Sequence, residues 1–429
     1  MSGPVRRAAI LAIGSELLTS GRIDSNSLVI TDALNAIGID VLFKAVIGDD
    51  RAELAAAFAY AMSRVDVVMF TGGLGPTEDD LTREAVATEL GLALHEDHAI
   101  TDAIRKRFEM RGWKMPEINR RQAMVPEGAV VLANPHGTAP GLWIEARGKC
   151  IALMPGPPRE MKPMLALIVQ GRLQARAGGI QLRRRILKIA GRSESRVEEL
   201  TQPIYSRWRD ETPPIETTIL AAPGQIELHL SARGGDEQAL TTALDRGEAA
   251  IREILPHDVF SADGRSLEEV VGQLLRERHL RIALAESCTG GLATSRLTDV
   301  PGSSDYVDRS VVVYSNTAKT ELLGVPADLI AAHGAVSDPV AAAMAAGIRE
   351  RSGVDVGVGI TGIAGPGGGT ESKPVGMVCI AVASDETVAR TFKFPGNREL
   401  IKTFAAFTAV DMVRRRLLGA AANADWLQK

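Results

Sequence analysis

The sequence predicts two doubly wound α/β domains joined by a small α+β module. Short apolar runs alternate with helical patterns before residue 170 and again after residue 261, an order typical of parallel sheets covered by helices on both faces. Between these regions the pattern is weaker, and residues 171–179 are rich in Gly and Arg, as in a linker. A chain of 429 residues suits two or three domains. We therefore place the domains at residues 1–170, 171–260 and 261–429.

The first domain shows strand signals where apolar runs end near Gly, Asp or Pro. These runs cover residues 8–13, 41–46, 65–71 and 151–154. Helical patterns occupy residues 26–37 and 53–62, begin again at residue 81, and follow residue 158 to about 170. Helices of this length between strands predict a parallel sheet.

The alternation of strand and helix patterns is weaker in the middle module than in the third domain. In the middle module we expect strands at residues 186–189 and 225–231, and helices at 195–205 and 236–254. In the third domain we expect strands at residues 282–286, 311–315 and 354–361, then a strand pair at 375–383 and 389–394. Its helices are expected at residues 266–278, after Ser287, around Lys319 and at 399–418.

Composition excludes several classes of function. The net charge of −4 gives no overall field that attracts nucleic acid, and we interpret the basic residues between 172 and 185 as a solvated linker and strand start. Three cysteines are too few for a disulfide scaffold and fit the cytoplasm. No apolar run approaches the roughly 20 residues that span a bilayer, so we expect no membrane contact.

Polar loops follow the strands of the third domain, where ligands bind in such sheets. Ser287 opens a loop of small residues at 287–291 that starts a helix. Free N–H groups and the helix dipole at such a start suit a phosphate. The alternative is a tight turn whose serine caps the helix, and this motif alone does not decide between them.

A second polar segment of this domain carries Ser304, Tyr314 and Lys319. A serine beside a lysine forms a dyad only when the lysine is neutral, which requires burial or nearby positive charge. A tyrosine can relay a proton or hold the lysine. The alternative is a surface lysine on an amphipathic helix. A third segment, Thr361 with a Gly-rich loop at residues 362–369, lacks the Gly-Lys-Ser/Thr ending of an ATP-binding P-loop.

Together these motifs strongly resemble the CinA family, competence/damage-inducible protein A. The motifs are AESCTGG (285–291), PGSS (301–304), VVYSNTAK (312–319), GAVS (334–337), TGIAGPGGG (361–369) and KPVG (373–376). They occur in order over the whole domain, which resembles the nicotinamide-nucleotide amidohydrolases. The resemblance implies hydrolysis of nicotinamide mononucleotide to nicotinate mononucleotide and ammonia, in salvage of pyridine nucleotides, without a metal or other cofactor.

On this resemblance, Ser304 is expected to attack the carboxamide carbon, with Lys319 as base and then acid. Tyr314 orients or relays, and Ser287 and Thr361 donate hydrogen bonds to the oxyanion or the base. Ser287 or Cys288 are alternative nucleophiles; a helix start lowers a thiol pKa, but no histidine lies in these motifs to serve Cys288. The residues expected to hold the phosphate are Thr289, Gly290, Gly291 and Arg398.

The first domain carries a comparable loop after its strand at residues 65–71. Gly72, Gly73 and Gly75 can bring backbone N–H groups to a phosphate. Asp79 and Asp80 would repel that phosphate unless a divalent cation lay between them, so a hard, oxygen-ligated metal is one interpretation. The other is that both acids stabilise the positive end of the helix.

This domain resembles the molybdopterin-binding part of the CinA family. Cofactor-synthesis proteins usually read TGGTG, whereas Leu74 stands here in place of the second threonine, which argues against a direct pterin role. The resemblance implies instead a metal-dependent ADP-ribose pyrophosphatase, in which metal neutralises charge while water attacks phosphorus. The candidate metal ligands are Glu16, Asp24, Asp79 and Asp80.

Two alternatives come from other classes of protein. One is a nucleotide- or pterin-binding protein without turnover. The presence of both candidate catalytic residues, Ser304 and Lys319, argues against it. The other is a DNA-uptake or recombination factor, against which stand the charge balance and the sparse aromatics. The middle module resembles the family's KH-like connector but shows no clear GXXG clamp. We interpret it as a connector or dimer contact, and we expect a homodimer acting on small nucleotides.

Overall fold

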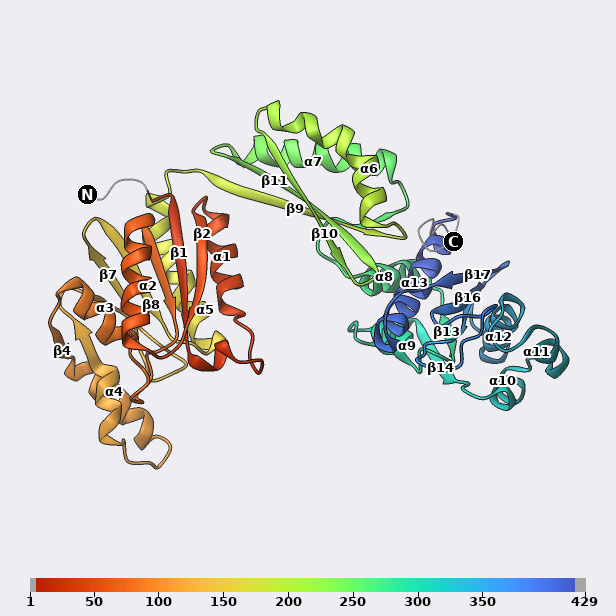
Figure 1. The fold of residues 1–429 in the computed structure, drawn as a ribbon, viewed down its shortest axis with the longest axis horizontal. Coiled ribbons are helices and arrows are strands. Elements are labelled where there is room, and N and C mark those ends of the chain that lie inside the picture. The colour runs from red at the N-terminus through yellow and green to blue at the C-terminus, as the bar shows by residue number, and fades with distance from the viewer. Residues whose placement is uncertain (1–4, 421–429) are drawn as a thin grey trace. The chain divides into compact units, whose positions relative to one another are not determined.

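The computed structural model describes residues 5–420 (Figure 1). The chain forms two compact units. The first runs up to Arg183 and includes the segment Arg233–Leu240. The second holds most of the middle module together with the third domain.

The sheet of the first unit has six strands in the order β2-β1-β3-β8-β7-β6. The four strands from β2 to β8 pair in parallel, and β7 and β6 add antiparallel pairs at one side. The strands are β1 (Arg7–Ile13), β2 (Asp40–Ile47), β3 (Val67–Thr71), β6 (Val130–Leu132), β7 (Gly141–Ala146) and β8 (Lys149–Met154).

Helices cover both faces of this sheet. Ile10 of β1 packs in a core with α1 and α5, whereas its neighbour Leu11 packs in a second core with α2 and α3, because successive strand residues point to opposite faces. These helices are α1 (Asn26–Ala36), α2 (Arg51–Arg64), α3 (Thr82–Leu90) and α5 (Pro158–Ile168). Between α3 and β6 the chain adds β4 (Leu94–Glu96), α4 (His98–Glu109) and β5 (Met124–Pro126). The double winding predicted for this domain is confirmed.

The middle module is a four-stranded sheet with two helices. Its strands, in the order β10-β11-β9-β12, are β10 (Ile215–Ala222), β11 (Gln225–Gly234), β9 (Gln181–Ala190) and β12 (Val259–Ser261), and its helices are α6 (Glu194–Tyr205) and α7 (Glu237–Ile254). The sequence did not predict β10, because its polar residues 216–218 are consecutive and do not alternate with apolar ones; only Ile215 of this strand is buried. The Arg-rich residues 183–185 belong to β9.

The sheet of the third domain has the order β14-β13-β15-β16-β17. β13 lies parallel to β14 and β15, while β16 and β17 are antiparallel. The strands are β13 (Ile282–Glu286), β14 (Val307–Val312), β15 (Val356–Gly362), β16 (Met377–Ala383) and β17 (Thr387–Lys393). β14 begins and ends earlier than predicted, which places Tyr314 in the loop after the strand.

Two groups of helices sandwich this sheet. Leu284 of β13 packs with α8 (Leu267–Glu277), α9 (Leu292–Thr298) and α13 (Arg398–Leu417), whereas Ala283 packs with the other group. That group comprises α10 (Asn316–Leu323), α11 (Ala327–His333) and α12 (Asp338–Ser352). Across residues 5–420, no helix combines the length and apolar character needed to cross a membrane.

Candidate functional site

Ser287 and Lys319 meet at the carboxyl end of the parallel strands in the third domain. Ser287 directly follows β13, and its backbone N–H donates to the Ile360 carbonyl on β15. Lys319 lies in α10, and its Nζ donates to Ser287 Oγ at 3.3 Å and to the Val313 carbonyl at 3.0 Å. The fold thus joins a hydroxyl and an amine that are 32 positions apart in the sequence.

The surroundings of Lys319 disfavour a positive charge. The residue is 1% exposed, and its burial lowers the pKa of the ammonium group. Its two hydrogen-bond partners, a hydroxyl and a carbonyl, carry no charge. A neutral Lys319 has a lone pair with which to accept the Ser287 proton, so this pair has the composition and geometry of a Ser–Lys dyad.

The helix start predicted to bind a phosphate is filled by the protein itself. Glu286, fully buried at the end of β13, accepts hydrogen bonds from the N–H groups of Gly291, Ala293 and Thr294. Thr289 is 0% exposed, so its side chain cannot touch a substrate. The expected phosphate contact with Thr289 and Gly291 is therefore wrong: a carboxylate already occupies the positive end of α9. The exposed Gly290 remains at the surface of the turn.

Ser304 lies at the amino end of the parallel strands, whereas Lys319 lies at their carboxyl end. It precedes β14, and the parallel register pairs the first residue of β14, Val307, with the first residue of β13, Ile282. The length of β13, roughly 16 Å at about 3.3 Å per residue, therefore separates Ser304 from Ser287. Within one chain, the expected pairing of Ser304 with Lys319 is wrong, because PGSS precedes a strand rather than following one.

Cys288 does not have the character of a nucleophile. It is 5% exposed and packs in the apolar core of the domain. Burial raises the pKa of its thiol to about 12, so the reactive thiolate is not formed near neutral pH.

The remaining expected residues have other partners. Thr361, 1% exposed, donates from its hydroxyl to the Ala335 carbonyl at 2.9 Å. Tyr314 is 62% exposed, and its hydroxyl accepts from Arg398 at 2.9 Å. Arg398 also donates to the Gly365 carbonyl at 2.8 Å. Within residues 5–420, neither Thr361 nor Tyr314 forms a hydrogen bond with the Lys319 amine.

Two residues that organise this site were not predicted. Glu286 is one, and its sequence signal is an acid at the last position of an otherwise apolar strand. Lys373 is the other: its Nζ donates to the carbonyls of His333 at 2.6 Å and Val336 at 2.7 Å, which ties the KPVG segment to the GAVS loop. Both act through backbone groups, which residue type alone does not reveal.

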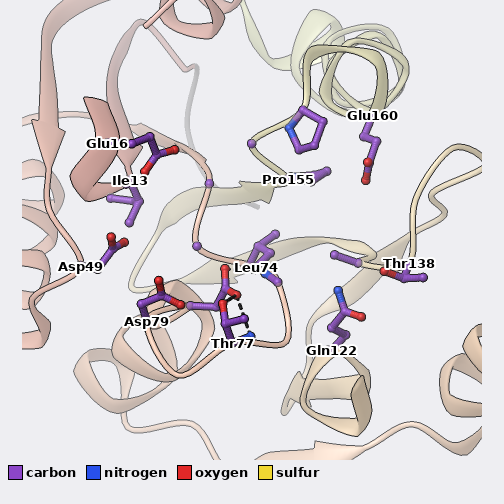
Figure 2. Close-up of a pocket in the computed structure, with 18 residues that line it drawn as sticks. Ile13, Glu16, Asp49, Leu74, Thr77, Asp79, Gln122, Thr138, Pro155 and Glu160 are labelled. Atoms are coloured by element: carbon purple, nitrogen blue, oxygen red, sulfur yellow. Dashed lines mark hydrogen bonds between the residues drawn. The ribbon is translucent and has the colours of Figure 1, made fainter. Parts of the chain in front are cut away.

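The first domain has a cleft of about 380 Å³ at the carboxyl end of its parallel strands. The predicted glycines Gly72, Gly73 and Gly75 line it. Figure 2 shows Glu16, Asp49 and Asp79 reaching the cleft from separate loops. Asp24 lines the adjoining cavity, which shares Glu16 with the first.

Asp80 lines the cleft and also holds the glycine loop. Its carboxylate accepts from the Gly75 N–H at 2.7 Å and from the Thr77 N–H at 2.9 Å. A Cβ on Gly75 would lie 2.3 Å from this carboxylate, and one on Gly73 would lie 2.1 Å from the Thr82 hydroxyl. The glycines are thus required for the packing of the loop on its own helix start.

The four acids expected to bind metal do not form a cage. Among residues 5–420, no group of three or more His, Cys, Asp or Glu side chains lies close enough to hold a metal ion. The Asp80 carboxylate accepts a hydrogen bond from the Gly75 N–H of its own loop, and Asp24 accepts one from the Ser27 N–H at 3.0 Å. The set of Glu16, Asp24, Asp79 and Asp80 therefore does not fit a preformed metal site.

Asn26 is an unpredicted residue of this region. Its side-chain amide donates to the Thr71 hydroxyl at 2.8 Å and to the Gly156 carbonyl. It joins the start of α1 to the ends of β3 and β8, and it lines the cavity that contains Asp24. The sequence feature that could have indicated Asn26 is an amide side chain at a helix start, directly after Asp24 and Ser25.

Three family models match the chain. The CinA C-terminal domain matches residues 264–417, a probable molybdopterin binding domain matches residues 9–175, and the damage-inducible protein CinA KH domain matches residues 184–261.

Relatives extend over almost the whole chain. A CinA-like protein of Koribacter versatilis is 47% identical over 418 residues, which is 96% of this chain and 100% of that protein. A putative competence-damage inducible protein of Caldicellulosiruptor bescii is 43% identical and covers 96% of this chain and 99% of its own. The crystal structure of a competence/damage inducible protein from Agrobacterium tumefaciens is 37% identical, with a TM-score of 0.35, and covers 35% of this chain and 93% of that chain. On the strength of the full-length relatives, the chain belongs to the CinA family.

Proposed function

We propose that the third domain hydrolyses the carboxamide of nicotinamide mononucleotide to nicotinate mononucleotide and ammonia. The observation that carries this proposal is the contact of the buried Lys319 Nζ with Ser287 Oγ. Burial lowers the pKa of Lys319, which makes this lysine better suited to act as a base than an exposed one. The choice of substrate comes from the resemblance of the domain's motifs to nicotinamide-nucleotide amidohydrolases.

The proposed reaction proceeds through an acyl-enzyme. Lys319 takes the proton of Ser287 as Oγ forms a bond to the carboxamide carbon. The tetrahedral intermediate collapses, the C–N bond breaks, and Lys319 returns the proton to the departing ammonia. Lys319 then deprotonates a water molecule that attacks the ester. Breakage of the ester bond releases the carboxylate, and the proton returns to Ser287 Oγ.

In this proposal Ser287 takes the nucleophilic role that the family resemblance implies for Ser304. The hydroxyl of Ser287 is the one within reach of the lysine, whereas Ser304 is exposed on the opposite edge of the sheet. The Ser287 N–H and the Thr361 hydroxyl already donate to backbone carbonyls, so we assign neither to the oxyanion.

Ammonia release tests this function. The full chain is incubated with nicotinamide mononucleotide, with free nicotinamide and the dinucleotide as controls, and with EDTA present because the dyad itself supplies nucleophile and base. We expect ammonia from the mononucleotide. Faster release from free nicotinamide would contradict a nucleotide substrate.

For the first domain we propose ADP-ribose pyrophosphatase activity. The support is a cleft that combines a glycine loop with the exposed acids Glu16 and Asp79, beside a second cavity with room for the rest of a nucleotide. Since the acids do not fit a preformed metal cage, we assign no metal-dependent step to them. Incubating the full chain with ADP-ribose and Mg²⁺ or Mn²⁺ should yield AMP; no AMP with either ion would refute the activity.

A further inference from the structure

Lys402 lies over the turn that carries Ser287. It belongs to α13, and its Nζ is 3.7 Å from the position that a Cβ would take on Gly290. Gly290 is exposed, and its N–H donates to the Ser287 carbonyl at 3.1 Å. A single tight turn therefore connects the proposed nucleophile to the backbone beneath the ammonium group.

The positive charge of Lys402 is not neutralised by the protein. Within the described residues 5–420, its side chain takes part in no hydrogen bond or ion pair. The residue is nevertheless half-buried, so part of the water that would solvate it is displaced. A cation in this position gains from an anionic ligand more than a fully solvated lysine would.

The N–H groups at the start of α9 and the Arg398 guanidinium already have partners within the protein. The N–H groups at the start of α9 donate to Glu286. Arg398 lies one helical turn before Lys402 and thus on the same side of α13, but its guanidinium donates to Tyr314 and to the Gly365 carbonyl. Arg398 adds positive charge to the mouth of the site. The three N–H donors of the Lys402 ammonium have no hydrogen-bond partner among the described residues.

We propose that Lys402 binds the phosphate of the substrate and thereby sets the preference of the site for a nucleotide over its nucleoside. This inference rests on the proposed amidase function and adds a specificity-determining residue to it. Gly290 has a matching role: the absence of a side chain leaves space beside the ammonium, and its φ of +64° would strain any other residue.

The test compares a substrate with and without the phosphate. Lys402→Gln keeps the length of the side chain and removes its charge. With nicotinamide mononucleotide we expect the variant to raise KM about 10- to 100-fold with little change in kcat, since a charge-assisted hydrogen bond contributes about 1.5–3 kcal/mol. With nicotinamide riboside, kcat/KM should stay at the wild-type value. Lys402→Arg should retain the low KM.

Lys393→Gln is the matched control, because Lys393 is an exposed lysine of the same domain on β17. It should alter neither substrate's kinetics. An unchanged KM for the mononucleotide in Lys402→Gln, or equal losses with both substrates, would overturn the assignment.

A binding measurement separates this inference from the amidase proposal. If the wild-type chain releases no ammonia from the mononucleotide, the amidase proposal fails, and ribose 5-phosphate then serves as the probe in calorimetry. Binding that is lost in Lys402→Gln and kept in Lys393→Gln supports the phosphate site. Equal binding by the wild type and Lys402→Gln, or no binding by the wild type, overturns it.

Discussion

At the residue scale, the chemistry of the third domain depends on how Lys319 is held. Its Nζ lies between a hydroxyl and a carbonyl oxygen, where burial lowers the ammonium pKa. A lysine on the exposed face of α10 would keep its ordinary pKa and remain protonated at neutral pH. The position of one amine relative to solvent thus determines whether the domain has a base.

The rate of amide hydrolysis should rise with pH through the lowered pKa of Lys319. The base is active when deprotonated, so kcat/KM increases as pH rises through this pKa and levels off below pH 10.5, the ordinary value for lysine. Ammonia release measured from pH 5 to 10 checks this. A rate still rising steeply at pH 10 would show that Lys319 is not the base.

Replacing Lys319 by methionine should abolish activity and stabilise the fold. Because the pKa of Lys319 is lower in the folded than in the unfolded state, the unfolded chain binds more protons between the two values. Stability therefore rises with pH in that window, and at lower pH the buried ammonium destabilises the protein. Thermal unfolding at pH 7 should show Lys319→Met melting above the wild type, whereas a lower melting temperature would contradict the burial argument.

Alanine substitutions separate the three candidate nucleophiles. Ser287→Ala should lower kcat by at least about 10³-fold, as expected when a nucleophile is removed. Ser304→Ala and Cys288→Ala should retain kcat within about threefold, given the distance of Ser304 and the unreactive thiol of Cys288. Ammonia release from nicotinamide mononucleotide decides this, and a large loss in Ser304→Ala alone would reverse the assignment.

Asp79 and Asp80 should differ sharply despite being neighbours. Asp80→Ala removes the acceptor of two backbone N–H groups of the glycine loop and should cost about 1–3 kcal/mol in the free energy of unfolding. Asp79→Ala, at an exposed position, should cost less than about 0.5 kcal/mol. Urea unfolding of both variants provides the comparison; equal stabilities would show that Asp80 does not hold the loop.

At the scale of elements, a buried ionic cluster joins the middle module to α13. Arg415 bonds Asp411 on its own helix at 2.7 Å and Asp258, just before β12, at 2.8 Å. Its guanidinium also donates to the Ala190 carbonyl at the end of β9. Arg192 completes the cluster by pairing with Asp258 at 2.9 Å. The end of β9 and the residue before β12 are thus both fastened to one helix.

Breaking this cluster should be costly. Arg415→Met leaves Asp411 and Asp258 buried with fewer partners, and the loss of one member of a buried ion pair typically costs about 3–5 kcal/mol. Arg416→Met is the control, because Arg416 pairs with the exposed Glu386 and should cost about 1 kcal/mol or less. Thermal unfolding of the two variants should show a clear loss only for Arg415→Met; similar melting temperatures would contradict the role of the cluster.

At the scale of the whole molecule, both α/β domains place their polar loops at the carboxyl ends of parallel strands. The cleft of the first domain follows β1, β3 and β8, and the dyad of the third follows β13 and β14. This common feature follows from parallel winding, since the carboxyl ends of the parallel strands, and the loops that follow them, lie at the same end of the sheet. It explains why a sequence search for loops after strands found Ser287, Gly72 and Gly73.

The same search failed where strand boundaries or partners were wrong. The segment 301–304 precedes β14, so Ser304 lies at the amino end of that strand, whereas the prediction requires it at the carboxyl end with Lys319. The helix start at residues 289–291 looked open because the sequence does not show that the side chain of Glu286, the last residue of β13, accepts hydrogen bonds from its N–H groups. The acids of the first domain looked like ligands because hydrogen bonds to backbone groups leave no signal in residue type.

The sequence by itself determined the doubly wound fold, the family, and the presence of a serine and a lysine suited to a dyad. Apolar periodicity and motif order are local properties, so they can be read along the chain. The tertiary structure decided which serine meets Lys319, that Glu286 fills the helix start, and that Lys402 lies beside Gly290 without a hydrogen-bond or ion-pair partner among the described residues. These facts depend on strand register and burial, which are set by residues far apart in the sequence.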